Sequence, residues 1–403
     1  MKNEPIYQSY LLTCLSPVHV GDGNSLRAFE YLYDKDAQTA YFFDEARWID
    51  LLSRHRLMDA FARYIGEMAR ALNRKGPFAQ QNLWEWMLAH GVAPDELRQA
   101  AAHAAKAERN AMMSEKSSLN DIALQATQGN GHPYLPGSTI KGALRTGLLY
   151  HLLRQEKGAR ERCRGKLKQA DFRSRWKMNQ MAAEMEDGLL AKLRPNRKAL
   201  ERPSRVSKEA QSPMLLSVMR GLLVSDAICV DAAQETIIVK KIDASMNQKA
   251  HRIEDKELPL ARECLPAGAQ LRFSITMYPE MLREVGITNI GQLLDAARSY
   301  IHDGLSLQAP LFARTHQKEL DEARTADLLL GGGTGFLTKT LDYPMFDDFA
   351  SGKQFVQQVL QANFFRHKHL QLDRTLSPRT LKLTNNGAGY SLMGLCQIRE
   401  ASR

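Results

Sequence analysis

The segment from Pro133 to Arg145, PYLPGSTIKGALR, constrains the fold of this chain more than any other stretch. Pro136 fixes its own φ and keeps the preceding residue extended, and Gly137 permits a sharp reversal. We expect Ser138 or Thr139 to cap the helix that follows. Lys141 and Arg145 are one helical turn apart on one face of that helix. A helix that begins at such a turn directs free N–H groups and partial positive charge outward, which favours a phosphate ligand.

The same segment also has a purely structural interpretation. Gly142, Ala143 and Gly147 can be small simply because the helix packs closely against a neighbouring element. Capped helices after Pro-Gly turns are common, so this segment alone leaves both anion binding and close packing open.

The charge of the chain is concentrated in one segment. The formal net charge is +10 over 403 residues, a length typical of two or three domains. Between residues 154 and 209 there are 17 Lys or Arg residues and only 8 Asp or Glu residues. A local excess of this kind favours a polyanionic partner over a generally solubilising surface.

Several classes of protein are excluded by what the sequence lacks. Its 5 cysteines show no CxxC and no Cys/His ligand spacing, which indicates reduced thiols in a cytoplasmic protein without a metal site. No cofactor motif is present. We expect no signal peptide and no membrane span, because no apolar run reaches about 18 residues.

The hydrophobic pattern predicts an α+β protein with two insertions. Strand signals occur before residue 34 and return after residue 221, whereas residues 44–128, including the Ala-rich stretch 96–109, have a helical period. Residues 154–212 form a second, basic insertion, which we expect to be partly flexible from residue 194 because of its prolines. Without the insertions, the order of elements is that of ferredoxin-like, RRM-like modules, which we assign in tandem to residues 1–220 and 221–403.

A glycine-rich loop occupies residues 331–335. It fits neither the dinucleotide fingerprint nor the P-loop, because Phe336 and Thr338 stand where those motifs need glycine. Gly331, Gly333 and Gly335 would let an extended polymer approach the backbone, with Lys339 nearby. A tight turn between packed elements is an equally good interpretation.

Two further sites combine residues that suit RNA. His19, beside the turn Gly21–Gly23, could serve as a general acid or base or as a stacking group, although a lone histidine at a turn is more often structural. Residues 364–369, FFRHKH, mix aromatic and cationic side chains as single-strand binders do, and the end of an amphipathic helix would explain them almost as well.

Taken together, these motifs resemble those of the RAMP superfamily of CRISPR effector proteins. The four stretches that carry the resemblance are Leu15–Gly23 (LSPVHVGDG), Pro133–Arg145, Glu263–Phe273 (ECLPAGAQLRF) and Leu330–Thr340. Residues 377–380 and 393–395 fit a weaker terminal pattern, from which Leu395 departs because an aromatic residue usually follows the glycine. Within the superfamily, the chain is most similar to the Csm-type subunit of type III-A complexes at the guide RNA 3′ end.

This resemblance implies a non-catalytic subunit of a cytoplasmic ribonucleoprotein. Its partners would be the 3′ part of the crRNA, the backbone and small Csm-type subunits, target RNA indirectly, and trimming nucleases. The candidate RNA-binding residues are His19, Ser138, Thr139, Lys141, Arg145, Arg162, Arg164, Arg173, Arg175, Lys177, Gly331, Gly333, Gly335 and Lys339. The alternatives are a RAMP-type endoribonuclease that uses His19, a backbone or 5′-end paralogue, and an unrelated DNA-binding protein.

Overall fold

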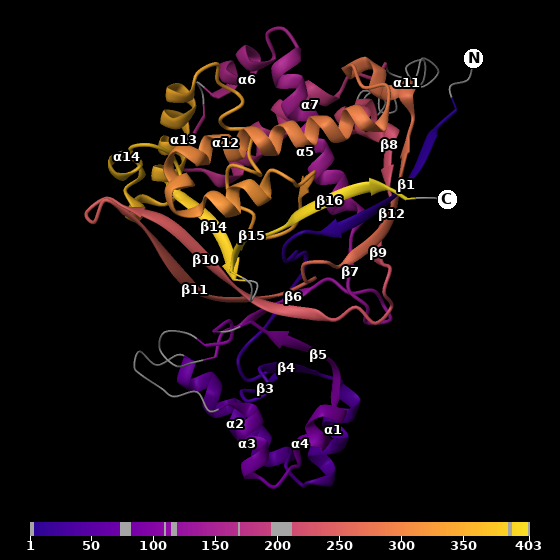
Figure 1. Cartoon of the computed structure of the whole chain (residues 1–403), viewed down its shortest axis with the longest axis vertical. Helices are drawn as coiled ribbons and strands as arrows, with labels where there is room; N and C mark the ends of the chain where they lie inside the picture. Colours follow the sequence, from indigo (N-terminus) through magenta and orange to yellow (C-terminus); the bar gives the residue numbers. More distant parts are fainter. Residues whose placement is uncertain are drawn as a thin grey trace.

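The computed structural model describes residues 4–72, 82–108, 110–113, 119–167, 170–194, 212–385 and 389–401. It shows two curled sheets, helices packed above them, and a smaller helical lobe at the opposite end of the molecule (Figure 1). The mixed α+β class predicted from the sequence is confirmed. No helix within the described ranges is long and apolar enough to cross a membrane.

The first sheet has strand order β13-β16-β1-β12-β9-β7, with β8 paired to β12. Its strands are β1 (Ile6–Cys14), β7 (Tyr134–Leu135), β8 (Leu222–Val224), β9 (Ala227–Cys229), β12 (Gln270–Met277), β13 (Leu328–Leu329) and β16 (Leu395–Glu400). The neighbours β16, β1, β12 and β9 are all antiparallel. With the helices α5 (Gly137–Gln155) and α12 (Ile290–Ala323), these four strands form a split βαβ arrangement.

The second sheet has strand order β2-β6-β11-β10-β5-β4-β3, and β14 and β15 extend it from β10. Its strands are β2 (Gly21–Leu26), β3 (Leu32–Asp34), β4 (Thr39–Phe43), β5 (Ala101–Ala107), β6 (Ile122–Gln125), β10 (Thr236–Asn247), β11 (Arg252–Cys264), β14 (Thr380–Asn385) and β15 (Tyr390–Leu392). Both sheets therefore contain strands from either side of residue 220. The division of the chain into two tandem modules at that residue stays a prediction.

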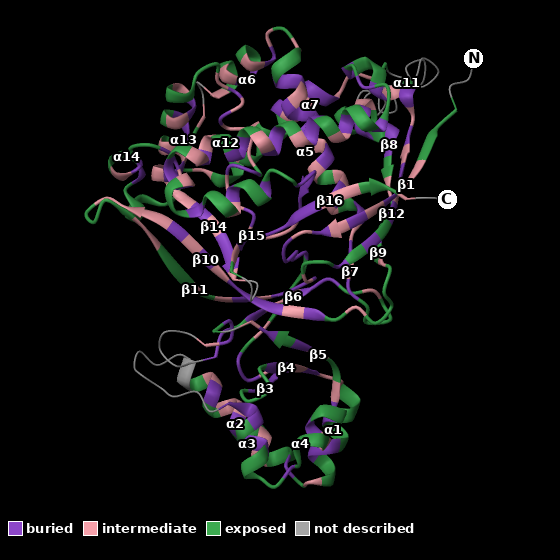
Figure 2. Cartoon of the chain, viewed as in Figure 1, coloured by how far each residue is buried: buried purple, intermediate pink, exposed green. Residues whose placement is uncertain are grey.

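The main core lies between the first sheet and the helices. Alternate residues of β1, including Tyr10 and Leu12, are buried, as are Leu271 and Phe273 of β12 (Figure 2). The other helices in this part are α6 (Ala159–Leu167), α7 (Arg175–Leu190), α10 (Pro213–Leu216), α11 (Pro279–Leu282), α13 (Phe349–Asn363) and α14 (His369–Leu372), with 3₁₀ turns η1 (Val218–Gly221), η2 (Arg283–Val285) and η3 (Phe365–His367). Residues 195–211, where we predicted a flexible loop, lie outside the described residues.

The helical lobe corrects the predicted helical insertion at residues 44–128. Its helices are α1 (Glu45–Arg54), α2 (Met58–Leu72), α3 (Leu83–Ala89) and α4 (Pro94–Gln99), and they pack around a core of their own. The Ala-rich stretch that follows is strand β5, and β6 lies further along the same segment. β5 pairs with β4 on one side and β10 on the other. Its backbone bonds on both edges outweigh the helix preference of alanine.

Candidate functional site

A cavity of about 410 Å³ joins the segments that the sequence singled out separately. Val20 and Gly21 follow the first strand, Thr139 and Gly142 lie on α5, and Gly331 belongs to the glycine loop. The remaining lining residues are Ala143, Thr146, Ala297, Tyr300, Ile301, Leu328, Leu329, Leu330, Gly332, Thr338 and Lys339. Backbone groups, threonine side chains and an ammonium therefore converge on one hollow between α5, α12 and the glycine loop. Such groups suit a phosphate or a sugar.

The N-terminus of α5 is capped differently from the prediction. The helix begins at Gly137 with Pro136 at the cap position, and neither Ser138 nor Thr139 caps it. The Asp226 carboxylate accepts a hydrogen bond from the Gly137 N–H at 2.7 Å. Gly137 itself fits tightly, because a Cβ there would lie 2.4 Å from the Val224 carbonyl oxygen. The fold thus already supplies a negative charge to this helix end, which weakens the case for a phosphate there.

Lys141 and Arg145 do not line the cavity. The lining residues of α5 are Thr139, Gly142, Ala143 and Thr146, which recur at helical spacing along one face. Lys141 and Arg145 lie on a different face of the same helix. The Arg145 guanidinium pairs with the Glu186 carboxylate of α7, and burial lowers the pKa of Lys141. Their predicted role on the RNA path stays a prediction.

The glycine loop packs closely against the segment that contains His19. Gly331, Gly333 and Gly335 have φ angles of 78°, 89° and 103°, in the left-handed region. A Cβ on Gly331 would lie 2.0 Å from the His19 carbonyl oxygen, and Gly332 N–H donates to that oxygen at 2.7 Å. The Lys339 ammonium donates to the Gly331 carbonyl. The loop's own packing therefore requires glycine at 331, while Gly331 and Gly332 still face the cavity.

His19 is buried behind this loop. Its Nδ1 lies 2.7 Å from the Glu263 carbonyl oxygen, while the Glu263 carboxylate bonds His103 and Thr236. Burial is the main cause that lowers the pKa of His19, and the positive charge of Arg262 lowers it further. The imidazole is therefore neutral near pH 7 and connects the glycine loop to the second sheet. A catalytic role for it stays a prediction.

Arg262 on β11 is a residue of this site that the sequence reasoning missed. Its Nη1 lies 2.9 Å and 2.8 Å from the positions of a Cβ on Gly332 and Gly333. Its Nε and Nη1 are buried, and neither has a hydrogen-bond partner within the described residues. Burial lowers the pKa of Arg262. Burial is also the main cause that lowers the pKa of Lys339, and the positive charge of Arg262 lowers it further. Buried donors without partners are costly, so this guanidinium suits an anion at the loop.

Three of the five candidate cations in the basic segment after α5 form ion pairs, two with acids of the segment itself and one with Asp347 outside it. Arg162 pairs with Glu156, Arg164 pairs with Asp347 at 2.6 Å, and Lys177 pairs with Asp171 at 3.3 Å. Arg173 and Arg175 are exposed, and neither has an ion pair in the part of the chain that the structure describes. Of the five cations predicted here to bind RNA, these two keep uncompensated charge.

Comparison with known proteins supports the resemblance of these motifs to the RAMP superfamily. The sequence profile of the RAMP superfamily matches residues 11–209. The chain is a RAMP superfamily protein. It is 25% identical over 403 residues to the CRISPR system Cms protein Csm5 of Mycobacterium tuberculosis, with 96% of each chain covered. The protein of the same name from Enterococcus italicus is 22% identical, with 84% of this chain and 81% of that one covered.

Solved structures share the fold. A chain in the cryo-EM structure of a Csm–crRNA–target RNA ternary complex of a type III-A CRISPR-Cas system matches with a TM-score of 0.60 and 16% identity, covering 98% of this chain and 100% of that chain. The crystal structure of T. onnurineus Csm5 matches with a TM-score of 0.55 and 17% identity, covering 96% and 99%.

Proposed function

We propose that this chain is the Csm5-type subunit of a type III-A Csm effector complex. The observation that carries this proposal is the similarity to proteins named Csm5 over 96% of the chain. In this role the chain binds the 3′ part of the crRNA, caps the filament of backbone subunits and supports crRNA maturation and complex assembly. It contacts target RNA indirectly and has no catalytic site of its own.

The chemistry of the cavity supports a contact with the guide backbone. The cavity is lined by the Lys339 ammonium, threonine side chains and the glycine loop, and Arg262 adds positive charge behind that loop. Such groups suit phosphates and sugars irrespective of base. A guide-binding subunit needs this property, because guide sequences vary while the backbone does not. The endoribonuclease alternative gains no support from His19, whose Nδ1 is already engaged by Glu263.

Gly142 offers a sharp test because it is exposed on the cavity wall and a Cβ there meets nothing within 4 Å. Gly142→Glu introduces a carboxylate into the cavity and should raise the Kd for single-stranded RNA about tenfold or more. Gly142→Lys has a side chain of similar length and should retain or strengthen binding. Fluorescence anisotropy with the full chain measures both values.

Unchanged RNA affinity in Gly142→Glu, with the variant melting like the wild type, would contradict the cavity as a guide contact. In reconstituted complexes, the same variant should leave the 3′ part of the crRNA open to an added nuclease, whereas the 5′ part stays protected. Loss of protection at the 5′ part instead would favour a different RAMP paralogue.

A further inference from the structure

The turn after α13 presents aromatic rings and positive charges to solvent. Residues 364–368 are all exposed, and Phe364 and Phe365 are 54% and 67% exposed. The Arg366 guanidinium lies 5.8 Å from the centroid of the Phe365 ring. Phe364 directly follows the last residue of α13, so the segment does lie at a helix end, but that position alone does not account for the exposure of both rings. Exposed apolar groups of this size mark a contact surface.

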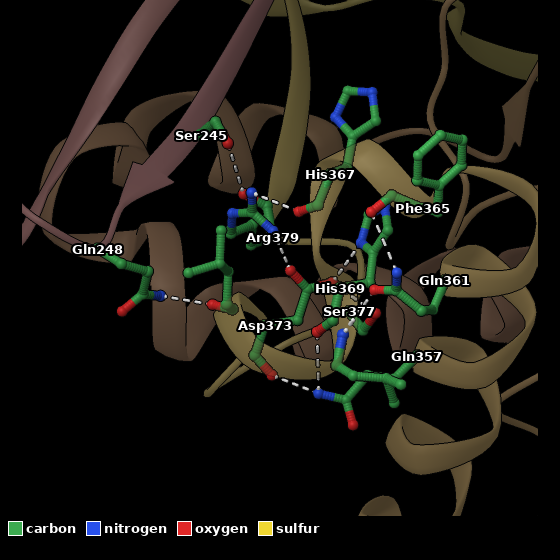
Figure 3. Close-up of polar contacts among 12 residues, drawn as sticks. Ser245, Gln248, Gln357, Gln361, Phe365, His367, His369, Asp373, Ser377 and Arg379 are labelled. Atoms are coloured by element: carbon green, nitrogen blue, oxygen red, sulfur yellow. Dashed lines mark hydrogen bonds and ion pairs between the residues drawn. The ribbon is translucent and has the colours of Figure 1, made fainter.

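A buried hydrogen-bond network behind the turn holds it in place (Figure 3). Asp373 is fully buried and accepts hydrogen bonds from Ser377 Oγ at 2.6 Å and from Arg379, with His369 Nδ1 at 2.8 Å. Gln361 donates to the Phe365 carbonyl at 3.1 Å. The rings of Phe365 and His367 point away from Asp373. Gln361 fixes the main chain of the turn, and the His367 ring stacks on His369 of the network, so the exposed Phe365 ring is pre-organised for a ligand.

A second segment adds to the same surface. Asn363 at the end of α13 donates to the Phe172 carbonyl at 3.0 Å, and the Phe172 ring contacts Phe355. The residues that follow Phe172 include exposed Arg173, Arg175 and Trp176, and Trp176 is 72% exposed. We call Arg173, Arg175, Trp176, Phe364, Phe365 and Arg366 the aromatic-basic surface.

We propose that the aromatic-basic surface binds single-stranded RNA, with bases stacked on its rings and phosphates paired with its arginines. Rings interleaved with cations are the arrangement that single-strand binders use, and stacking needs bases that are free of a duplex. A common protein-binding surface has an apolar centre depleted of charge. Here an arginine is adjacent in sequence to Trp176 and to Phe365, and Phe364 is two positions from Arg366. The inference rests on the proposed function and gives it a second RNA contact, made by residues that do not line the cavity.

Trp176 provides a direct probe of this contact. The other three tryptophans, Trp48, Trp84 and Trp86, are 5–7% exposed, so acrylamide quenches mainly the emission of Trp176. Adding a single-stranded oligouridylate to the full chain should protect Trp176 from acrylamide. If an equal amount of duplex RNA, added in place of the oligouridylate, protected Trp176 to the same extent, the proposal would be overturned.

Substitution at Phe365 separates stacking from simple apolar contact. Phe365→Leu keeps apolar area but loses the ring face, and it should weaken oligouridylate binding at least fivefold, whereas Phe365→Tyr should bind like the wild type. Phe349→Ala, at the opposite end of α13 and 44% exposed, is the matched control and should leave the affinity unchanged. Melting curves check that each variant is folded. If Phe365→Leu folds poorly, Arg366→Gln replaces it and should weaken oligouridylate binding by the same factor.

The outcomes distinguish this inference from the proposed function. Wild-type affinity in Phe365→Leu, together with weakened binding in Gly142→Glu, would overturn the aromatic-basic surface and leave the cavity contact standing. Loss of assembly with backbone subunits without loss of RNA affinity would identify a protein contact and also overturn it. An absence of RNA binding by the wild-type chain would overturn the proposed function itself.

Discussion

Asp342, just beyond the glycine loop, has a carboxyl group whose pKa the fold shifts from its ordinary value. Burial raises its pKa from 3.8 to about 6. The folded chain therefore keeps this proton over a range where the unfolded chain releases it, so the associated stability is present below about pH 4 and is lost as the pH rises through about 6. Asp342→Asn should raise the free energy of unfolding by about 1–3 kcal/mol near pH 7.5 and have little effect near pH 4.

Urea denaturation at the two pH values measures this difference. Asp347→Asn is the matched control: Arg160 and Arg164 lower the pKa of this exposed carboxyl, so its replacement should give no gain near pH 7.5. An equal gain from Asp342→Asn at both pH values would show that its effect is not electrostatic.

Single residues also show how far sequence reasoning reaches into the site. The segment that forms the start of α5 and the glycine loop were recognisable because each motif is contiguous, and residues of α5 and of the loop line the cavity. Whether Lys141 and Arg145 contact RNA in the cavity depends on which face of α5 meets the cavity. The contact of Gly147 with Ala297 of α12 fixes that face. Arg262 reaches the glycine loop only through tertiary packing, so no local pattern pointed to it.

At the scale of elements, the close approach of α5 and α12 requires a glycine at position 147 but not at position 142. A Cβ on Gly147 would lie 2.5 Å from the Ala297 Cα, a backbone atom that cannot easily move. Gly147→Ala should therefore destabilise the protein by about 1–3 kcal/mol or more. Gly142→Ala on the same helix should stabilise it by about 0.5–1 kcal/mol, because the new methyl group meets nothing and alanine favours a helix.

Urea unfolding of the two variants measures this contrast in one helix. A stabilising effect of Gly147→Ala would show that α5 and α12 separate more readily than their packing indicates, and a destabilising effect of Gly142→Ala would contradict the open space around that residue. The sequence had named both glycines together as packing residues, and only the position of α12 separates their roles. The Ala-rich strand β5 gives the same lesson, because its pairing with β4 and β10 joins residues far apart in the chain.

At the scale of the whole molecule, the helical lobe is an insertion whose two ends meet. β4 and β5 pair in antiparallel fashion, and Asp44 N–H donates to the Ala100 carbonyl at 3.1 Å. Residues 45–99 can therefore be replaced by an Asn-Gly turn without moving either strand. The excision would expose Phe29 and Leu32, which belong to the lobe's core, and Tyr41 and Phe43, which stack on Trp84 and Trp48. All four are therefore changed to Thr in the same variant.

The shortened chain should fold and bind single-stranded RNA with an affinity within about threefold of the full chain, a change of less than 1 kcal/mol. This follows because the cavity and the aromatic-basic surface are built from elements outside residues 45–99. Circular dichroism and fluorescence anisotropy measure the two properties separately. A folded variant with affinity reduced about tenfold would place an RNA contact on the lobe, and a variant that fails to fold would show that the second sheet depends on the lobe's core.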